Sequence, residues 1–174
     1  MQTITLQTTP KIYVACLAAY NNGFLHGQWI DANQDAEAIH AEIQDMLEAS
    51  PVGGAEEWAI HDYEGFEGLK LSEYESIEDV AQYAQLIAEH GEAWALFAEY
   101  EGTNYATKEA FEEAYQGEWD SEEDFAENLA EDTMQIPEHL QFYIDYEKLA
   151  RDLFINDYFS AKGDGYKVHV FSRL

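Results

Sequence analysis

Positively charged residues are scarce in this chain of 174 residues, which has eight Lys and Arg against 36 Asp and Glu. The formal net charge is −28, far beyond the magnitude of roughly 2–8 that suits the solubility of a small domain. Such a negative surface repels nucleic acid and anionic lipid. We therefore expect a basic protein partner, with no direct binding of nucleic acid and no association with a membrane.

Cysteine is almost absent as well, and long apolar runs are missing. Cys16 stands alone, which excludes a disulfide framework and a zinc site built from several cysteines. No stretch approaches the roughly 20 apolar residues of a membrane helix, and the first residues do not follow the signal-peptide pattern. We expect a cytoplasmic protein that uses no metal and no other cofactor.

Apolar and aromatic residues, at 47% and 14%, are plentiful enough for a folded core. The charge is distributed unevenly along the chain. Up to Glu147 there are 33 acids and three bases, a net of −30, whereas the last 27 residues hold three acids and five bases, a net of +2. Adaptation to high salt would make the whole chain acidic, so this distribution counts against an enzyme from a salt-loving organism.

The first third of the chain predicts a small antiparallel sheet with one helix. Apolar runs at 11–20 and 24–30 flank Asn22 and Gly23, a pair typical of a two-residue hairpin turn in which both residues have positive φ. Gly27 is compatible with a bulge in the second strand. An amphipathic helix is expected at 35–49 and a third strand at 58–63.

Helical patterns dominate the remainder. Helices are expected at 76–90, 92–100 and 107–116, the last ended by Gly117, and then at 121–132 and 145–156, with a closing strand at 166–171. We predict an α+β fold in an elongated chain of three small domains. These are an antiparallel sheet with one helix at 1–75, a small helical bundle at 76–117, and a mixed α/β domain at 118–174.

Rows of carboxylates on the expected helices carry the functional interpretation. Residues three or four apart on a helix share a face, with Cβ atoms about 5–6 Å apart. Three acidic rows lie opposite apolar stripes: Glu42, Asp45 and Glu48; Glu109, Glu112 and Glu113; Glu123, Glu127 and Glu131. Each unneutralised pair destabilises its helix by roughly 0.2–0.5 kcal/mol, so a solvated helix face explains one row better than it explains all three.

The spacing of these rows is similar to that of DNA phosphates, which lie about 6–7 Å apart along one strand. The 28 net charges equal those of about 14 base pairs. We take 18 carboxylates as candidates for contact with a basic partner. They are Glu42, Asp45, Glu48, Glu73, Glu75, Glu78, Asp79, Glu109, Glu112, Glu113, Glu118, Asp120, Glu122, Glu123, Asp124, Glu127, Glu131 and Asp132.

A calcium-binding loop is the sharpest competing interpretation. Asp31, Asn33, Asp35 and Glu42 occupy positions 1, 3, 5 and 12 of an EF-hand loop. Position 6, which requires glycine, is Ala36, and the residues before the loop have a strand pattern rather than a helical one. A calcium site is therefore disfavoured.

The enzyme interpretations lack specificity. Paired carboxylates could serve a glycosidase, but among 36 acids such pairs occur by chance. His61 and Asp62 could orient a base, but no Ser or Cys nucleophile accompanies them, and a buried histidine at a strand end is the simpler interpretation. Trp29, Trp58 and Tyr143 are expected in the core rather than on a ligand platform. We expect no enzyme and no catalytic residues.

Several segments resemble the ArdA antirestriction proteins. The opening IYVACLAAYNNG at 12–23, with LHGQWI at 25–30, is similar to the start of that family. AIHDYE from Ala59, YIDY from Tyr143 and ARDL from Ala150 are similar to its middle and C-terminal signatures. The similar segments occur in the family's order and cover most of the chain.

The resemblance implies an elongated monomer of three small domains and a homodimer joined through the third, curved like bent duplex DNA. It implies that the partner is a type I restriction-modification enzyme, whose methyltransferase core and DNA-recognition subunit are blocked at the DNA-binding groove. Genes of this family typically lie on mobile elements, and its antirestriction segment would fall at or near 121–132. The alternative that stays open is an acidic decoy or chaperone for another basic DNA-binding protein.

Overall fold

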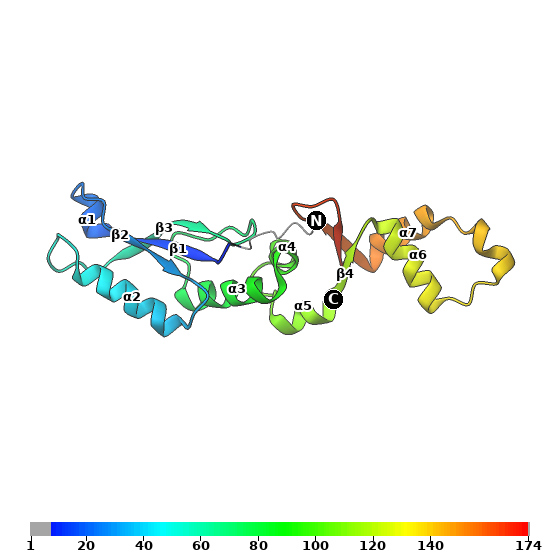
Figure 1. Cartoon of the computed structure of the whole chain (residues 1–174), viewed down its shortest axis with the longest axis horizontal. Helices are drawn as coiled ribbons and strands as arrows, with labels where there is room; N and C mark the ends of the chain where they lie inside the picture. The colour runs from blue at the N-terminus through cyan, green and yellow to red at the C-terminus, as the bar shows by residue number, and fades with distance from the viewer. Residues whose placement is uncertain (1–7, 174) are drawn as a thin grey trace, which may run out of the picture. The chain divides into compact units, whose positions relative to one another are not determined.

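The computed structural model describes residues 8–173. The chain divides into two compact units, one running to Ala95 and the other starting at Leu96 (Figure 1). We call them the N-terminal and the C-terminal unit. Both combine helices with a three-stranded antiparallel sheet, so the mixed α and β character expected from the sequence is confirmed. The division into three domains stays a prediction.

The N-terminal unit is built on a sheet with strand order β2-β1-β3. Its strands are β1 (Lys11–Cys16), β2 (Gly27–Asp31) and β3 (Trp58–Glu64), and both neighbours pair with β1 in antiparallel register. Ile12 and Val14 of the central strand are fully buried. The predicted strands are therefore present, and alternate side chains of β1 contribute to the core.

The connection between β1 and β2 differs from the predicted two-residue turn. A short helix, α1 (Leu17–Asn21), follows β1 directly and is capped by Cys16, whose Sγ accepts from the Ala19 N–H at 3.5 Å. Asn22 has φ −94° and only Gly23 has a positive φ, at +82°. The predicted turn type is wrong because it requires positive φ at both residues.

Gly27 does not lie at a bulge, contrary to the prediction. It pairs in regular register with Ala15, and a Cβ at this position would lie 2.6 Å from the Val14 carbonyl oxygen and 2.7 Å from the Tyr13 ring. Glycine is required here because of this close approach. The sheet irregularity lies in the pairing of β1 with β3, where His61 is the extra residue.

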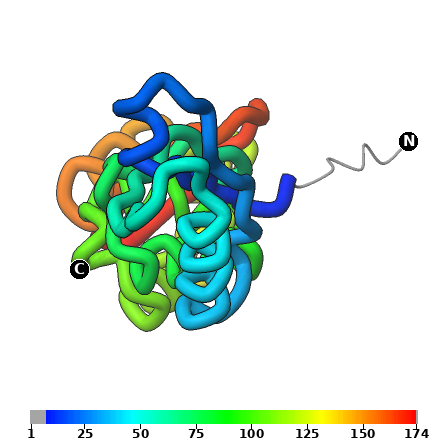
Figure 2. Tube along the Cα trace, turned by 90° about the vertical axis from the view of Figure 1, so that its left-hand side faces the viewer, coloured from blue at the N-terminus to red at the C-terminus, as the bar shows by residue number. Residues whose placement is uncertain are grey.

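Two helices complete the N-terminal unit. The helix α2 (Ala36–Glu48) packs on β1 and β2, and α3 (Ile77–His90) packs beside α2. In both views α2 lies on the opposite side of the unit from α1 (Figures 1 and 2). Ile39 and Ile43 of α2 are buried, as their helical spacing predicts. Gly91, with φ +64°, separates α3 from α4 (Glu92–Glu101), which contains the boundary between the units.

The C-terminal unit has a sheet with strand order β4-β6-β5. These strands are β4 (Tyr115–Trp119), β5 (Tyr158–Lys162) and β6 (Val168–Ser172). The sequence predicted only β6, at 166–171. The helix predicted at 107–116 ends earlier, since Gly117 lies inside β4 at a register shift, with φ +100°. The predicted domain boundary after residue 117 falls within this strand.

Helices and stacked aromatic rings surround that sheet. The helices are α5 (Lys108–Ala114), α6 (Glu122–Thr133), α7 (Tyr146–Asn156) and the 3₁₀ helix η1 (Glu138–Tyr143). The core holds Phe97, Phe111, Phe159 and Phe171, and the ring centroids of Phe97 and Phe171 are 5.5 Å apart. This core fixes the backbone from which the acidic helices project.

Three side chains expected in the interior are not buried. Trp29 is exposed, Trp58 is only half-buried, and Tyr143 of η1 is 83% exposed. His61, expected as a buried strand-end histidine, has a partly exposed side chain whose Nε2 is 3.7 Å from a Glu73 oxygen. Sequence patterns alone cannot distinguish an aromatic residue that packs in a core from one on a sheet edge or a surface turn.

Candidate acidic protein interface

The carboxylates of this chain lie at its surface. Residues 8–173 contain all 36 Asp and Glu, and none of these side chains is buried. Of the 18 predicted contact residues, 15 are exposed, and Glu42, Glu75 and Asp79 are half-buried. Exposed carboxylates are accessible to a partner, which is the first requirement of an electrostatic interface.

Aromatic packing determines which face of α6 meets solvent. Phe125 is buried, and its ring centroid lies 5.4 Å from Trp119, 5.8 Å from Phe154 and 4.9 Å from Tyr158. Ser121 caps the helix by accepting from the Asp124 N–H at 3.0 Å. With this face fixed, the predicted row is exposed in full: Glu123, Glu127 and Glu131.

The row on α2 is held in place by neutral side chains. Glu42 accepts from Gln34 Nε2 at 2.7 Å and from Gln28 Nε2 at 3.3 Å, one donor on each carboxylate oxygen. Glu48 accepts from Gln44 Nε2 at 3.2 Å. These amides orient the carboxylates without cancelling their charge, which Lys or Arg would do.

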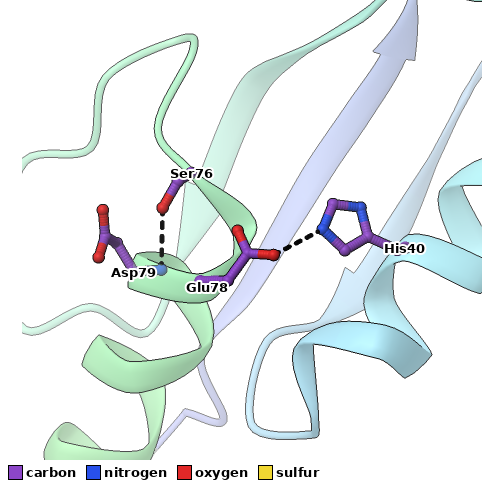
Figure 3. A network of polar contacts seen from close by, with 4 residues as sticks. All are labelled: His40, Ser76, Glu78 and Asp79. Carbon is purple, nitrogen blue, oxygen red and sulfur yellow. Dashed lines mark hydrogen bonds and ion pairs between the residues drawn. The ribbon is translucent and has the colours of Figure 1, made fainter.

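The N-terminus of α3 adds a second acidic element beside α2. Ser76 caps it by accepting from the Asp79 N–H at 3.1 Å, and Glu78 points toward His40 of α2, with 3.1 Å between Oε1 and Nε2 (Figure 3). The Glu78 backbone N–H, and then the His40 imidazole, lower the pKa of this carboxyl below its usual range. The contact places the Glu78 carboxylate beside His40 of α2 within the N-terminal unit.

Further predicted contact carboxylates lie in the turn before α3, in the N-terminal unit, and on the helix α5, in the C-terminal unit. Glu75 accepts from the Ser72 N–H at 3.0 Å, which fixes it in the turn. On α5, Phe111 and Ala114 are buried, whereas the acidic row of this helix is exposed. That row is Glu109, Glu112 and Glu113.

Two predicted contact residues are partly neutralised. Lys167 Nζ lies 3.9 Å from Glu118 and 3.8 Å from Asp120. The next acid, Glu122, accepts from the neutral donor Ser160 Oγ at 2.7 Å. The interface of the C-terminal unit is therefore more negative along α6 than at the end of β4.

The helix dipole explains the positions of some of these acids but not of others. A carboxylate in the first turn stabilises a helix, and a base does so in the last turn. Glu122, Glu123 and Asp124 lie in the first turn of α6 and fit this rule. The last turns of α2, α4, α5, α6 and α7 contain no base. Acids such as Glu48 and Asp132 near these ends oppose the dipole, so helix stability does not explain them.

The structure does not support the calcium interpretation. Asp31 is the last residue of the strand β2, whereas an EF-hand loop follows a helix. Its Oδ1 accepts from the Asn33 N–H at 2.8 Å in a tight turn. In residues 8–173, no three His, Cys, Asp or Glu side chains are grouped so that they could hold a metal ion. None of the helices in that range combines the length and apolar character needed to cross a bilayer.

A family model described as "Antirestriction protein (ArdA)" matches residues 12–168, nearly the whole chain. The chain belongs to the ArdA family. No curated protein matches it significantly. Membership implies an antirestriction function exerted by an inhibitor rather than an enzyme, with type I restriction enzymes as the interacting proteins.

In this ArdA protein, sequence reasoning found the acidic rows but missed the groups that orient them. Gln28 reaches Glu42 from β2, and Ser160 reaches Glu122 from β5. These pairs are separated by 14 and 38 residues in the sequence, so helical periodicity cannot reveal them. The only local signal was the series of glutamines around α2: Gln28, Gln34 and Gln44.

Proposed function

We propose that this ArdA protein inhibits type I restriction-modification enzymes by DNA mimicry, occupying the groove of the methyltransferase core and its DNA-recognition subunit in competition with DNA. In this proposal it acts in the cytoplasm as a homodimer formed through residues 118–174, and its gene belongs to a mobile element. The supporting observation is the exposure of unneutralised carboxylate rows on helix faces whose opposite sides are buried.

The charges suit such a groove for two physical reasons. Lys and Arg that bind a DNA backbone read negative charge at regular spacing rather than base identity. Carboxylates one helical turn apart provide a repeat of about 5–6 Å, near the separation of successive phosphates. Neutral donors hold several of these groups in defined positions, which lowers the entropy lost on binding.

Inhibition of ATP-dependent DNA cleavage by a purified type I enzyme tests the proposal. The variant Asp45→Asn/Glu48→Gln removes two charges from the α2 row, neither of which has a Lys or Arg partner among the ion pairs of residues 8–173. We expect it to need roughly 3- to 10-fold more protein for half-inhibition, about 0.7–1.4 kcal/mol for the two charges together.

The control removes the same number of charges from acids that bases already neutralise. Glu64 lies 3.0 Å from Lys11, and Glu147 lies 3.7 Å from Arg151. Glu64→Gln/Glu147→Gln is expected to inhibit within about twofold of the natural protein. Equal losses in both variants would mean that only total charge matters. No inhibition by the natural protein, with capture of another basic DNA-binding protein, would favour the acidic decoy instead.

A further inference from the structure

The C-terminal unit contains an open cavity beside the second half of α6. Its volume is about 450 Å³, and it lies between α6, the turn that follows, η1 and the start of α7. Glu127 and Glu131 line one side, while Met134, Ile136, Phe142 and Tyr146 line the others. Phe142 is 96% exposed and Met134 is 47% exposed, so the cavity presents neighbouring apolar side chains to solvent.

The two carboxylates of this cavity are available for a ligand. They are one helical turn apart on the same face of α6 and are both exposed. Within residues 8–173, neither side chain has a hydrogen-bond or ion-pair partner. No Lys or Arg lines the cavity. The site thus combines uncompensated negative charge with apolar and aromatic walls.

A second cavity, of about 510 Å³, differs from the first because basic side chains line it as well as carboxylates. It lies at the other end of α6 and also contains carboxylates, among them Glu122 and Glu147. However, Arg151 and Lys162 line it too, so this cavity has two bases for its four carboxylates. Of these two cavities, only the first is lined by carboxylates without any Lys or Arg.

The chain itself shows how such groups hold a cation. Lys11 Nζ lies 3.0 Å from a Glu64 oxygen and 4.9 Å from the centroid of the Trp29 ring. The Arg173 guanidinium lies 5.8 Å from the ring centroids of both Tyr100 and Phe159. A carboxylate and an aromatic face together stabilise a long basic side chain, because the ring faces the charge and covers the methylene stem.

We infer that the cavity formed by Glu127, Glu131, Phe142 and Tyr146 is a receptor for one arginine side chain of the restriction enzyme's DNA-binding groove. This inference rests on the proposed function. Arginine suits the site better than lysine, because its planar guanidinium can bridge two carboxylate groups and stack on a ring. The cavity would make this part of α6 an anchoring point rather than one segment of a uniform charged surface.

A small-molecule probe tests the cavity without the enzyme. Isotope-labelled protein is titrated with N-acetyl-arginine methylamide while NMR signals of the Phe142 and Tyr146 rings and the Met134 methyl group are followed. Saturable shifts confined to these groups are expected. The citrulline analogue, a neutral isostere, should cause less than about a tenth of the shift because it lacks the charge that the carboxylates and rings attract. Equal shifts with both probes, or none with arginine, would overturn the inference.

Charge variants on the same helix provide the matched control. Glu127→Gln/Glu131→Gln should abolish the arginine response, whereas Asp124→Asn/Asp132→Asn, which removes two charges outside the cavity, should leave it within about twofold. If both double variants lose the response equally, the protein attracts arginine through its general charge and the cavity has no specific role.

The neighbouring aromatics extend the test to the enzyme. Phe142→Ala is expected to weaken binding to the methyltransferase core about 5- to 20-fold, whereas Tyr143→Ala, which alters an exposed ring next to the cavity, should change it less than twofold. Sedimentation must give the same oligomeric state for both variants. If Phe142→Ala instead disrupts self-association, a second copy of this chain covers the cavity. If the natural protein fails to bind the core but the probe binds, the proposed function fails and the arginine site does not.

Discussion

Glu42 illustrates how a carboxylate can be oriented and still remain charged. Each of its oxygens accepts from a glutamine amide, Gln34 at 2.7 Å and Gln28 at 3.3 Å. A hydrogen bond to a charged acceptor contributes about 1.5–3 kcal/mol when partly shielded. A lysine in place of either glutamine would also fix Glu42, but it would remove the net negative charge that a basic groove attracts.

Substitutions of Gln34 separate orientation from charge. Gln34→Met keeps the charge of Glu42 and removes its shorter hydrogen bond, so we expect inhibition to weaken about 2- to 5-fold with no change in its salt dependence. Gln34→Lys keeps a donor but neutralises Glu42, so inhibition should weaken and its salt dependence should decrease. Titrations of the enzyme at several salt concentrations provide both quantities.

Gln85, an exposed glutamine of α3, supplies the control. Gln85→Met should inhibit like the natural protein. If Gln34→Met matches this control, orientation of Glu42 does not contribute to binding.

The pair of Glu78 and His40 predicts a specific pH response. The pKa of Glu78 is lowered, first by its own backbone N–H and then by His40. A carboxyl whose pKa is lower in the folded state stabilises the fold above its unfolded pKa, and this contribution is lost as the pH falls through the folded pKa. In His40→Ala the pKa of Glu78 should rise only part of the way, because the larger cause remains. NMR titration of the Glu78 carboxyl carbon measures this, and an unchanged pKa in the variant would contradict the contact.

At the scale of the helix, the acidic rows should oppose stability. Asp45 and Glu48 lie near the C-terminal end of α2, where no base offsets the helix dipole. Each such charge costs about 0.3–1 kcal/mol at low ionic strength. Asp45→Asn/Glu48→Gln should therefore raise the free energy of unfolding by roughly 0.5–2 kcal/mol, while it weakens inhibition.

Urea unfolding in low-salt and high-salt buffer measures the expected increase in the free energy of unfolding of Asp45→Asn/Glu48→Gln. The increase should be smaller in high salt, because salt screens the interaction of the charges with the helix dipole. Glu64→Gln/Glu147→Gln breaks two ion pairs and should give no such gain. A destabilised α2 variant would show that these acids serve the fold instead.

The helices were predictable because their signals are local. Ser76 and Ser121 cap α3 and α6 at the positions that the sequence indicates, and the apolar stripes are buried as expected. β4 was missed because its partner strand β6 is remote in the sequence. β5 was missed because its side chains do not alternate between apolar and polar, although β6 follows it closely. The hairpin turn predicted at Asn22-Gly23 was wrong because the helix α1 follows β1 directly, so the two residues end that helix instead of joining two strands.

For the candidate interface, the features that depend on one helix were predictable and those that depend on contacts between elements were not. The exposure of the rows follows from helical periodicity, which needs only neighbours within a helix. Neither the donors to Glu42 and Glu122 nor the cavity at Phe142 could be predicted, because they depend on contacts between elements. The neutralisation of Glu118 by Lys167 likewise requires the pairing of β4 with β6.

At the scale of the whole molecule, charge acts on folding and binding in opposite directions. The N-terminal unit has 17 acids and two bases, and the C-terminal unit has 19 acids and six bases. Salt screens repulsion within each unit and should stabilise the fold. The same screening should weaken attachment to a basic groove.

We therefore expect the melting temperature to rise by a few degrees between about 20 and 500 mM salt, while the affinity for the methyltransferase core falls at least tenfold over that range. Calorimetric melting and binding titrations in the same buffers measure both. Affinity that is independent of salt would indicate an apolar interface in place of an electrostatic one.

Competition with duplex DNA for the methyltransferase core tests the central claim most directly. The apparent dissociation constant of the inhibitor is measured at increasing concentrations of a duplex that contains the enzyme's target sequence. If the acidic surface occupies the DNA-binding groove, this constant rises in proportion to the DNA concentration without reaching a limit. A constant that reaches a plateau, with DNA and inhibitor bound to one enzyme together, would contradict DNA mimicry.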